Sequence, residues 1–119
     1  MSIRRVVPDI KSERFDESKE FYVGLLGFEI AMDSEWITTF ASPTNPTAQV
    51  SIVKRDASAK VDPDISIEVA DVDSLHDQAL RRGDKIVYPL TDEPWNVRRF
   101  FVRDPNGLII NVLSHIDEN

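Results

Sequence analysis

The chain has 119 residues, of which 41% are hydrophobic and 29% are charged, and these values indicate one globular domain with a single packed core. Its formal net charge of -7 disfavours binding to nucleic-acid phosphates and to anionic membrane surfaces. It contains no cysteine, which excludes disulfides, thiolate metal ligands and a cysteine nucleophile. Because its first residues do not resemble a signal peptide and no apolar run is long enough to span a membrane, we expect a cytoplasmic protein.

The first half of the chain, residues 1–55, predicts a strand, a helix and three further strands. The opening strand is expected over residues 3–10. A helix is expected over residues 15–26, where apolar residues recur at helical spacing and Gly27 supplies a stop. The three strands that follow are expected over residues 28–33, 36–42 and 47–54.

The second half, residues 64–119, repeats this order after a linker at residues 56–63. A strand is expected over residues 64–69, and one face of the next helix carries Val72, Leu75, Ala79 and Leu80 before Gly83. Three strands follow over residues 85–90, 97–104 and 108–115. The two βαβββ modules predict an α+β fold in which helices cover one face of the sheet and leave the other face free to curve.

Hydrogen-bonding side chains share one face of several predicted strands. Because neighbouring residues on a strand point to opposite faces, Asp64, Ser66 and Glu68 lie opposite three apolar residues. The same alternation places further residues on the polar side of other strands, namely Val7 with Asp9, Gln49 with Ser51, and Asn111 with Leu113 and His115. Such a face is either exposed to solvent or the wall of a pocket, and the scarcity of lysine on it favours a pocket.

Two tryptophans and two adjacent arginines are candidates for ligand contacts. Trp36 opens a predicted strand and Trp95 ends the loop before another, and each offers a flat ring for stacking, although either can instead pack in the core or at a subunit interface. Arg98 and Arg99 have opposite strand parity, so one should face the pocket and the other the helices or a partner subunit. Parity alone leaves open which one faces inward, because a β-bulge would exchange them. The inward arginine would bind a carboxylate or pair with an acidic residue such as Glu68.

The run FYVGLLGF and the pattern W-x-x-R-x-F-x-x-R-D-P-x-G over residues 95–107, together with the two modules, resemble the vicinal oxygen chelate superfamily. This superfamily includes glyoxalases, bleomycin-resistance proteins and extradiol dioxygenases, and the second pattern is most similar to the bleomycin-resistance branch. The resemblance covers nearly the whole chain. It implies a curved, mostly antiparallel eight-stranded sheet around a cavity, completed in a homodimer, with a small molecule bound inside.

Metal enzymes of that superfamily hold a divalent cation with one side chain, usually His or Glu, from each of four strands. The resemblance places these four positions at Val7, Ser51, Asp64 and Asn111. Only Asp64 is a strong ligand, which implies that the usual metal site is dismantled and that no cofactor is bound there. A displaced set on the same strand faces, Asp9, Glu68 and His115, could instead hold Zn, Fe or Mn, although His115 also reads as a surface residue near the C-terminus.

The leading hypothesis is a metal-independent protein that holds a planar or aromatic small molecule. Its predicted contacts are Trp36, Gln49, Ser51, Asp64, Ser66, Glu68, Trp95, Arg98, Arg99 and Asn111. The alternative is a divalent-metal-dependent lyase, isomerase or dioxygenase that uses the displaced set. A third hypothesis treats the polar face as the interaction surface of a regulatory or structural dimer, and it predicts a shallow, open sheet face.

Overall fold

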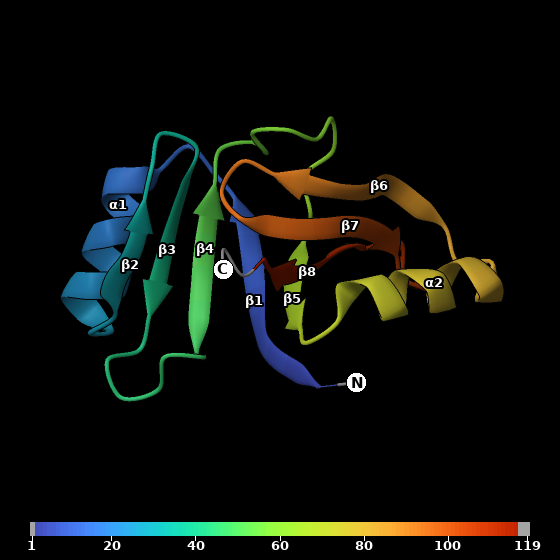
Figure 1. Cartoon of the computed structure of the whole chain (residues 1–119). Coiled ribbons are helices and arrows are strands. Elements are labelled where there is room, and N and C mark those ends of the chain that lie inside the picture. The colour runs from blue at the N-terminus through green and yellow to red at the C-terminus, as the bar shows by residue number, and fades with distance from the viewer. Residues whose placement is uncertain (1, 117–119) are drawn as a thin grey trace.

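The computed structural model describes residues 2–116 and consists of one eight-stranded sheet with helices outside it (Figure 1). The first half contains β1 (Ile3–Lys11), α1 (Phe15–Lys19), the π-helical segment η1 (Glu20–Leu25), β2 (Glu29–Asp33), β3 (Ile37–Ala41) and β4 (Gln49–Val53). The second half contains β5 (Ile65–Val69), α2 (Val72–Arg82), β6 (Ile86–Glu93), β7 (Val97–Arg103) and β8 (Ile109–His115). The predicted α+β fold with two βαβββ modules is confirmed.

The strand order of the sheet is β2-β3-β4-β1-β5-β8-β7-β6, so each module contributes one continuous side. The antiparallel pair β1–β5 joins the two modules at the centre. Within the modules β1 is parallel to β4 and β5 is parallel to β8, and the remaining neighbours are antiparallel. The sheet is therefore mostly antiparallel, as predicted, and its two sides repeat the same topology.

Helix α2 has a capping residue at each end. The Asp71 carboxylate accepts a hydrogen bond from the Ser74 backbone N–H, and this satisfies a donor that the first turn of a helix leaves unpaired. Gly83 ends the helix with a φ of 80°, a left-handed conformation that favours glycine. Between these residues Val72 and Ala79 are buried against Phe100 and other residues of the second-half core.

The prediction that Leu80 lies on the buried apolar face of α2 is wrong. Leu80 is 56% exposed. His76 packs there instead, with its ring edge-on to that of Phe100 at a centroid distance of 4.9 Å. The helical spacing that predicted Leu80 also admits His76, and the sheet contacts the side of the helix that carries the histidine.

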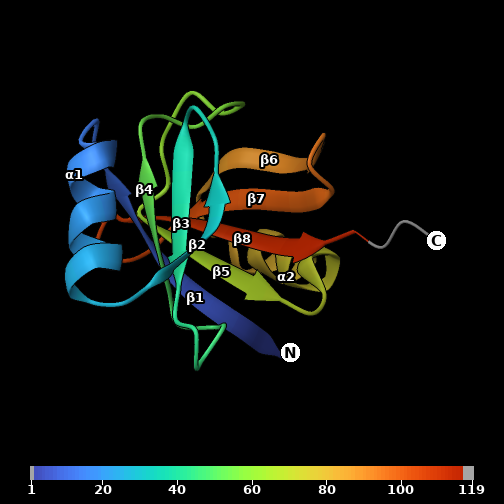
Figure 2. The same cartoon turned by 90° about the vertical axis from the view of Figure 1, so that its left-hand side faces the viewer.

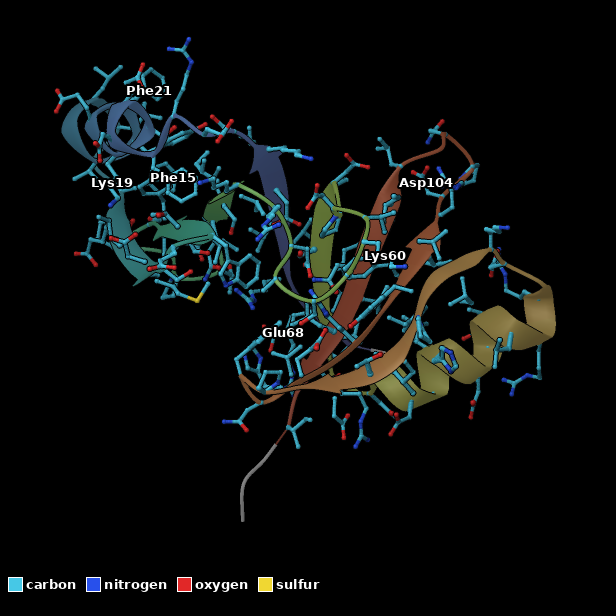
Figure 3. All side chains as sticks on the ribbon, turned by 90° about the horizontal axis from the view of Figure 1, so that it is seen from above. Phe15, Lys19, Phe21, Lys60, Glu68 and Asp104 are labelled. Atoms are coloured by element: carbon cyan, nitrogen blue, oxygen red, sulfur yellow. The ribbon has the colours of Figure 1, made fainter. Side chains whose placement is uncertain are left out.

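The first helix covers the predicted range but changes character along its length, from one α-helical turn to the π-helical η1. Neither segment buries a residue or has a side-chain cap at its start. The ring of Tyr22 stacks on that of Phe40 in β3 with a centroid distance of 5.1 Å and provides the main aromatic contact with the sheet. Phe21, Val23, Leu25 and Leu26 remain exposed, and Phe21 lies at the periphery of the molecule (Figure 3).

The two helices lie outside the sheet at opposite ends of the molecule, which leaves the inner face uncovered by helix (Figures 1 and 2). The linker between β4 and β5 arches over one end of the sheet (Figure 1). Across residues 2–116, none of the helices has the length and apolar character needed to cross a membrane.

Candidate ligand pocket

The inner face of the sheet encloses a pocket of about 450 Å³ that is lined by both halves and the linker. Figure 3 shows the teal strands of the first half and the orange strands of the second half on different sides of the molecule. Its walls include the following residues of the predicted polar faces: Val7, Asp9, Gln49, Ser51, Ser66, Asn111, Leu113 and His115. The alternation of side chains thus predicted which face of the sheet lines the pocket.

Three strands place a hydrogen-bonded chain on the floor of the pocket. In the sheet register Ser66 lies beside Val7 on one side and Asn111 on the other. Asn111 Nδ2 donates to Ser66 Oγ at 3.0 Å, and Ser66 Oγ donates to Asp9 Oδ2 at 2.6 Å. Asn111 is 7% exposed, and its Oδ1 is a buried oxygen without a hydrogen-bond partner among the described residues. This atom is an unused acceptor in the pocket wall.

Asp9 differs from the other carboxylates around the pocket because it forms no ion pair within residues 2–116. Burial raises its pKa to about 7, and the hydrogen bond from Ser66 and the charge of Arg5 offset this only in part. A carboxyl group with such a pKa can gain or lose a proton near neutral pH.

Glu68 does not itself line the pocket, but it accepts hydrogen bonds from two residues that do, from Arg5 Nε at 2.5 Å and from His115 Nδ1 at 2.9 Å. Arg5 Nη1 also donates to Gln49 Oε1 at 2.6 Å. Burial opposes ionisation of Glu68, but the contacts with His115 and Arg5 outweigh it and lower the pKa of the carboxyl. The predicted pairing of Glu68 with Arg98 or Arg99 is wrong, because β1 lies beside β5 and brings Arg5 to this carboxylate instead.

Arg99 is the inward arginine of the pair and is 3% exposed. Its Nη1 and Nη2 donate to the two oxygens of Asp56 at 2.9 and 2.8 Å, and its Nε donates to Glu93 at 2.6 Å. Burial disfavours the guanidinium charge, yet these carboxylates outweigh that effect and raise the pKa of Arg99. Burial likewise opposes ionisation of Asp56, but the Arg99 contact and two backbone amides hold its pKa below the ordinary value.

The two tryptophans come together at the pocket. Their rings lie 5.7 Å apart at an angle of 53°, and both line the wall. Trp95 follows β6 in a turn. The next residue, Asn96, adopts a φ of 65°, which asparagine tolerates, and the Asn96 backbone N–H donates to the Glu93 carbonyl. Trp95 also covers the Arg99 guanidinium, with its ring centroid 5.2 Å from the Arg99 Cζ atom. The pocket therefore has an aromatic wall supported by a fixed cation.

Three predicted contacts, Glu68, Arg98 and Asp64, are not among the residues that line the pocket. Arg98 points away from it and pairs with Asp92 and Asp73 at the surface. Asp64 has the same parity as Ser66 but precedes β5, and its carboxylate accepts from the Ile109 backbone N–H at 2.8 Å. In the sheet register Ser66, rather than Asp64, is the β5 residue beside Asn111.

The residues at the superfamily's metal positions do not fit a divalent cation. Val7 has no lone pair, Ser51 and Asn111 are neutral and weak ligands, and Asp64 is directed elsewhere. The displaced set also fails to assemble, because Asp9 contacts Ser66 whereas Glu68 contacts Arg5 and His115. Within residues 2–116 no group of three or more His, Cys, Asp or Glu side chains is arranged to hold a metal ion.

Several pocket residues were missed by sequence reasoning. Arg5 shares strand parity with Val7 and Asp9, so the alternation on β1 could have identified it. Asp56 could not be identified in this way, because it lies in the irregular linker, where no periodicity indicates direction. Other missed residues that line the pocket are Ala31, Met32, Ser34, Ile37, Thr39, Val53 and Val97.

Comparison with known proteins agrees with this architecture. Residues 6–112 match the family model of the Glyoxalase/Bleomycin resistance protein/Dioxygenase superfamily. No curated protein matches the chain.

Solved structures share the fold at low sequence identity. A superfamily member from Vibrio splendidus 12B01 superposes with a TM-score of 0.72 at 18% identity, covering 95% of this chain and 99% of that one. Methylmalonyl-CoA epimerase from Mycobacterium tuberculosis gives 0.70 at 20% identity, covering 98% and 89%. The epimerase from Streptomyces coelicolor gives 0.65 at 17% identity, covering 97% of each chain. With a family match over residues 6–112 and this shared fold, the chain belongs to the glyoxalase/bleomycin resistance protein/dioxygenase superfamily.

Proposed function

We propose that this protein binds a planar or aromatic small molecule in the pocket without a metal ion, as in the bleomycin-resistance branch of the superfamily. The observation that carries the proposal is the pair Trp36 and Trp95 on the wall of a pocket whose floor is polar and hydrogen-bonded. Apolar pockets with a few convergent polar groups are the usual form of small-molecule sites.

The pocket can bind such a ligand through two kinds of contact. The tryptophan rings offer faces for stacking, which contributes about 0.5–1.5 kcal/mol per aromatic pair beyond the area that is buried. The floor residues Ser66 and Asn111 fix the orientation of the polar end of the ligand. Binding of this kind supports sequestration or delivery of the ligand, and neither requires a chemical step.

The independence from metal rests on donor chemistry. A catalytic metal site generally needs about three protein ligands, and the superfamily positions offer a valine, a serine, an asparagine and an aspartate that is engaged with backbone. The methylmalonyl-CoA epimerases share the fold with this chain at 20% identity or less, and this likeness shows the fold alone.

Tryptophan fluorescence tests the proposal directly, because the chain contains two tryptophans and both line the pocket. We expect a set of planar aromatic compounds to include some that quench the emission in a saturable way, with the same dissociation constant in the presence of EDTA. Trp36→Phe and Trp95→Phe should each remove part of the signal. Quenching that EDTA abolishes would instead favour the metal-dependent enzyme, and saturable binding unchanged in both variants would contradict the assigned pocket.

We further propose that two copies of the chain form a homodimer through the surface of the first helix. The exposed side chains of Phe21, Val23, Leu25 and Leu26 form a run of apolar residues that is unusual on a monomer. Sedimentation at several protein concentrations should show a dimer, and Leu25→Glu should shift it to monomer without unfolding. A monomer at all concentrations would contradict this part of the proposal.

A further inference from the structure

We propose that the pocket selects planar ligands whose polar end carries N–H donors, such as an amidine, a guanidine or an aryl amine, and that it rejects carboxylates. This inference rests on the proposed function and narrows it to a ligand class. It reverses the expectation that the inward arginine would bind an oxyanion.

Both arginines of the pocket are already engaged with acceptors. Arg99 donates through all three of its nitrogen atoms, two to Asp56 and one to Glu93. Arg5 donates to Glu68 and Gln49. A ligand carboxylate at either guanidinium would lie beside a protein carboxylate that already pairs with it, and the two like charges would repel each other.

The free hydrogen-bonding capacity of the pocket floor is of the accepting kind. Ser66 gives its one hydroxyl hydrogen to Asp9, so Ser66 Oγ must accept from Asn111, and the Nδ2 atom of Asn111 is the one that faces it. This arrangement turns Asn111 Oδ1 away from Ser66, where it has no partner among the described residues. A buried amide oxygen without a donor costs about 1–3 kcal/mol. Because this atom has almost no accessible surface, a ligand N–H recovers that cost only when neighbouring side chains move to admit it.

Asp9 provides a second acceptor beside the first. Both Asp9 and Asn111 contact the same Ser66 hydroxyl, at 2.6 and 3.0 Å, so the two side chains lie next to each other in the pocket floor. Asp9 has no cationic partner within residues 2–116, in contrast to Asp56, Glu68 and Glu93. Two adjacent acceptors match the paired donors of an amidine or guanidine.

The charge distribution of the pocket agrees with this selection. Two carboxylates, Asp56 and Glu93, surround the single Arg99 guanidinium, and Arg5 is matched by Glu68. With Asp9 ionised, the described pocket carries an excess of negative charge. Such a pocket attracts cationic and repels anionic ligands of the same shape.

Benzamidine, benzamide and benzoate test the inference, since they share one ring and differ in whether the polar end is a cation, a neutral amide or an anion. Their dissociation constants are measured by tryptophan quenching at about pH 8, where carboxylates are ordinarily ionised. We expect benzamidine to bind at least about tenfold more tightly than benzoate, with benzamide between them.

Two variants assign the effect to the pocket floor. Asp9→Asn keeps the shape of the side chain and should weaken benzamidine binding about tenfold while leaving benzamide binding nearly unchanged. Asp92→Asn is the matched control, because it removes the same charge at the outer surface, where Asp92 pairs with Arg98, and it should leave all three constants unchanged. If Asp9→Asn does not fold, the comparison of probes on the natural chain still decides the question.

The outcomes separate this inference from the function on which it rests. Benzoate binding as tightly as benzamidine overturns the inference but leaves a small-molecule pocket in place. Benzamidine binding that survives Asp9→Asn unchanged also overturns it. If none of the three probes quenches the emission at millimolar concentration, the inference is wrong. The proposed function fails as well only if no compound of the wider aromatic set quenches the emission.

Discussion

The two halves of the chain share one topology, but they bury their helices to different extents. α2 is capped at both ends and buries Val72 and Ala79 in a core with Phe100. α1 and η1 have no side-chain cap, bury no residue and leave four apolar side chains exposed. A repeated fold therefore does not need two equally packed modules, because the topology is kept although the helix of the first half buries no residue.

Where the halves meet, several contacts around the pocket are polar. Asp9 of the first half bonds to Ser66 of the second, Arg5 bonds to Glu68, and Asp56 of the linker bonds to Arg99. The site thus depends on both halves even though their helices do not contribute equally. The predictions below test this asymmetry, beginning with the largest expected effect.

The contact between the linker and the second half should be the most sensitive point. Arg99→Met leaves Asp56 and Glu93 buried without a cation, and we expect it to lower the free energy of unfolding by about 4 kcal/mol. Arg98→Met removes the neighbouring arginine, whose ion pairs are exposed, and should cost less than about 1 kcal/mol. Urea denaturation measures the free energy of unfolding of both variants. Equal losses would show that the buried ion pairs of Arg99 contribute no more to stability than the exposed ion pairs of Arg98.

An aromatic truncation in each half compares their cores. Phe100→Ala opens a cavity in the packed second-half core and should destabilise the protein by about 3 kcal/mol. Phe21→Ala removes a side chain that is 49% exposed and should cost less than about 1 kcal/mol in a monomer. Thermal unfolding at several protein concentrations is the measurement. If the proposed dimer forms, the loss for Phe21→Ala should grow with concentration.

Asp9 should make stability depend on pH at the junction of the halves. Its pKa is about 7 in the folded chain against an ordinary value of 3.8, so between these values the folded state binds more protons than the unfolded state. The contribution of Asp9 to stability is therefore fully present below about pH 4 and is lost as the pH rises through about 7.

Asp9→Asn should remove this dependence and raise the free energy of unfolding at about pH 8 by about 1–2 kcal/mol relative to the unchanged chain. Denaturation at about pH 5 and about pH 8 supplies the comparison. Asp92→Asn serves as the control, because hydrogen bonds from Arg98 lower the pKa of Asp92 and its contribution is lost only at acidic pH. The same pH slope in both variants would exclude Asp9 as its source.

The helix caps give the smallest effect. Asp71→Ala removes the side-chain cap of α2 and should destabilise the protein by about 1 kcal/mol. Arg14→Ala changes the corresponding position of α1, where no side-chain cap exists, and should change stability by no more than about 0.3 kcal/mol. Chemical denaturation measures the loss of stability in each variant. Equal losses would mean that the two helices depend equally on the side chain at their N-cap position.

Alternation along the strands predicted the pocket face because it depends only on neighbouring residues. Gln49, Ser51 and Asn111 line the pocket as their parity requires. Parity could not choose between Arg98 and Arg99, since that choice depends on pairing with a strand elsewhere in the chain. In the structure Arg99 lies opposite Leu113, which lines the pocket.

Features without local periodicity were beyond sequence reasoning. Asp64 shares the parity of Ser66, but β5 begins only at Ile65. A backbone N–H of β8 donates to the Asp64 carboxylate instead. Asp56 pairs with Arg99, which lies 43 positions later in the chain. The π-helical form of η1 has no signature in the spacing of its apolar residues, which suits an α-helix equally well.

The contacts that build the pocket join distant parts of the chain, and this has a consequence for the order of folding. Arg5 and Glu68 are 63 positions apart, Asp9 and Ser66 are 57, and Asn111 and Ser66 are 45. Contacts of such separation form only after the chain has lost most of its loop entropy. The hairpins and α2 can assemble early from local contacts, whereas the site cannot exist in either half alone. Recovery of ligand binding during refolding should therefore lag behind recovery of helical signal and mark the last step by which the chain becomes functional.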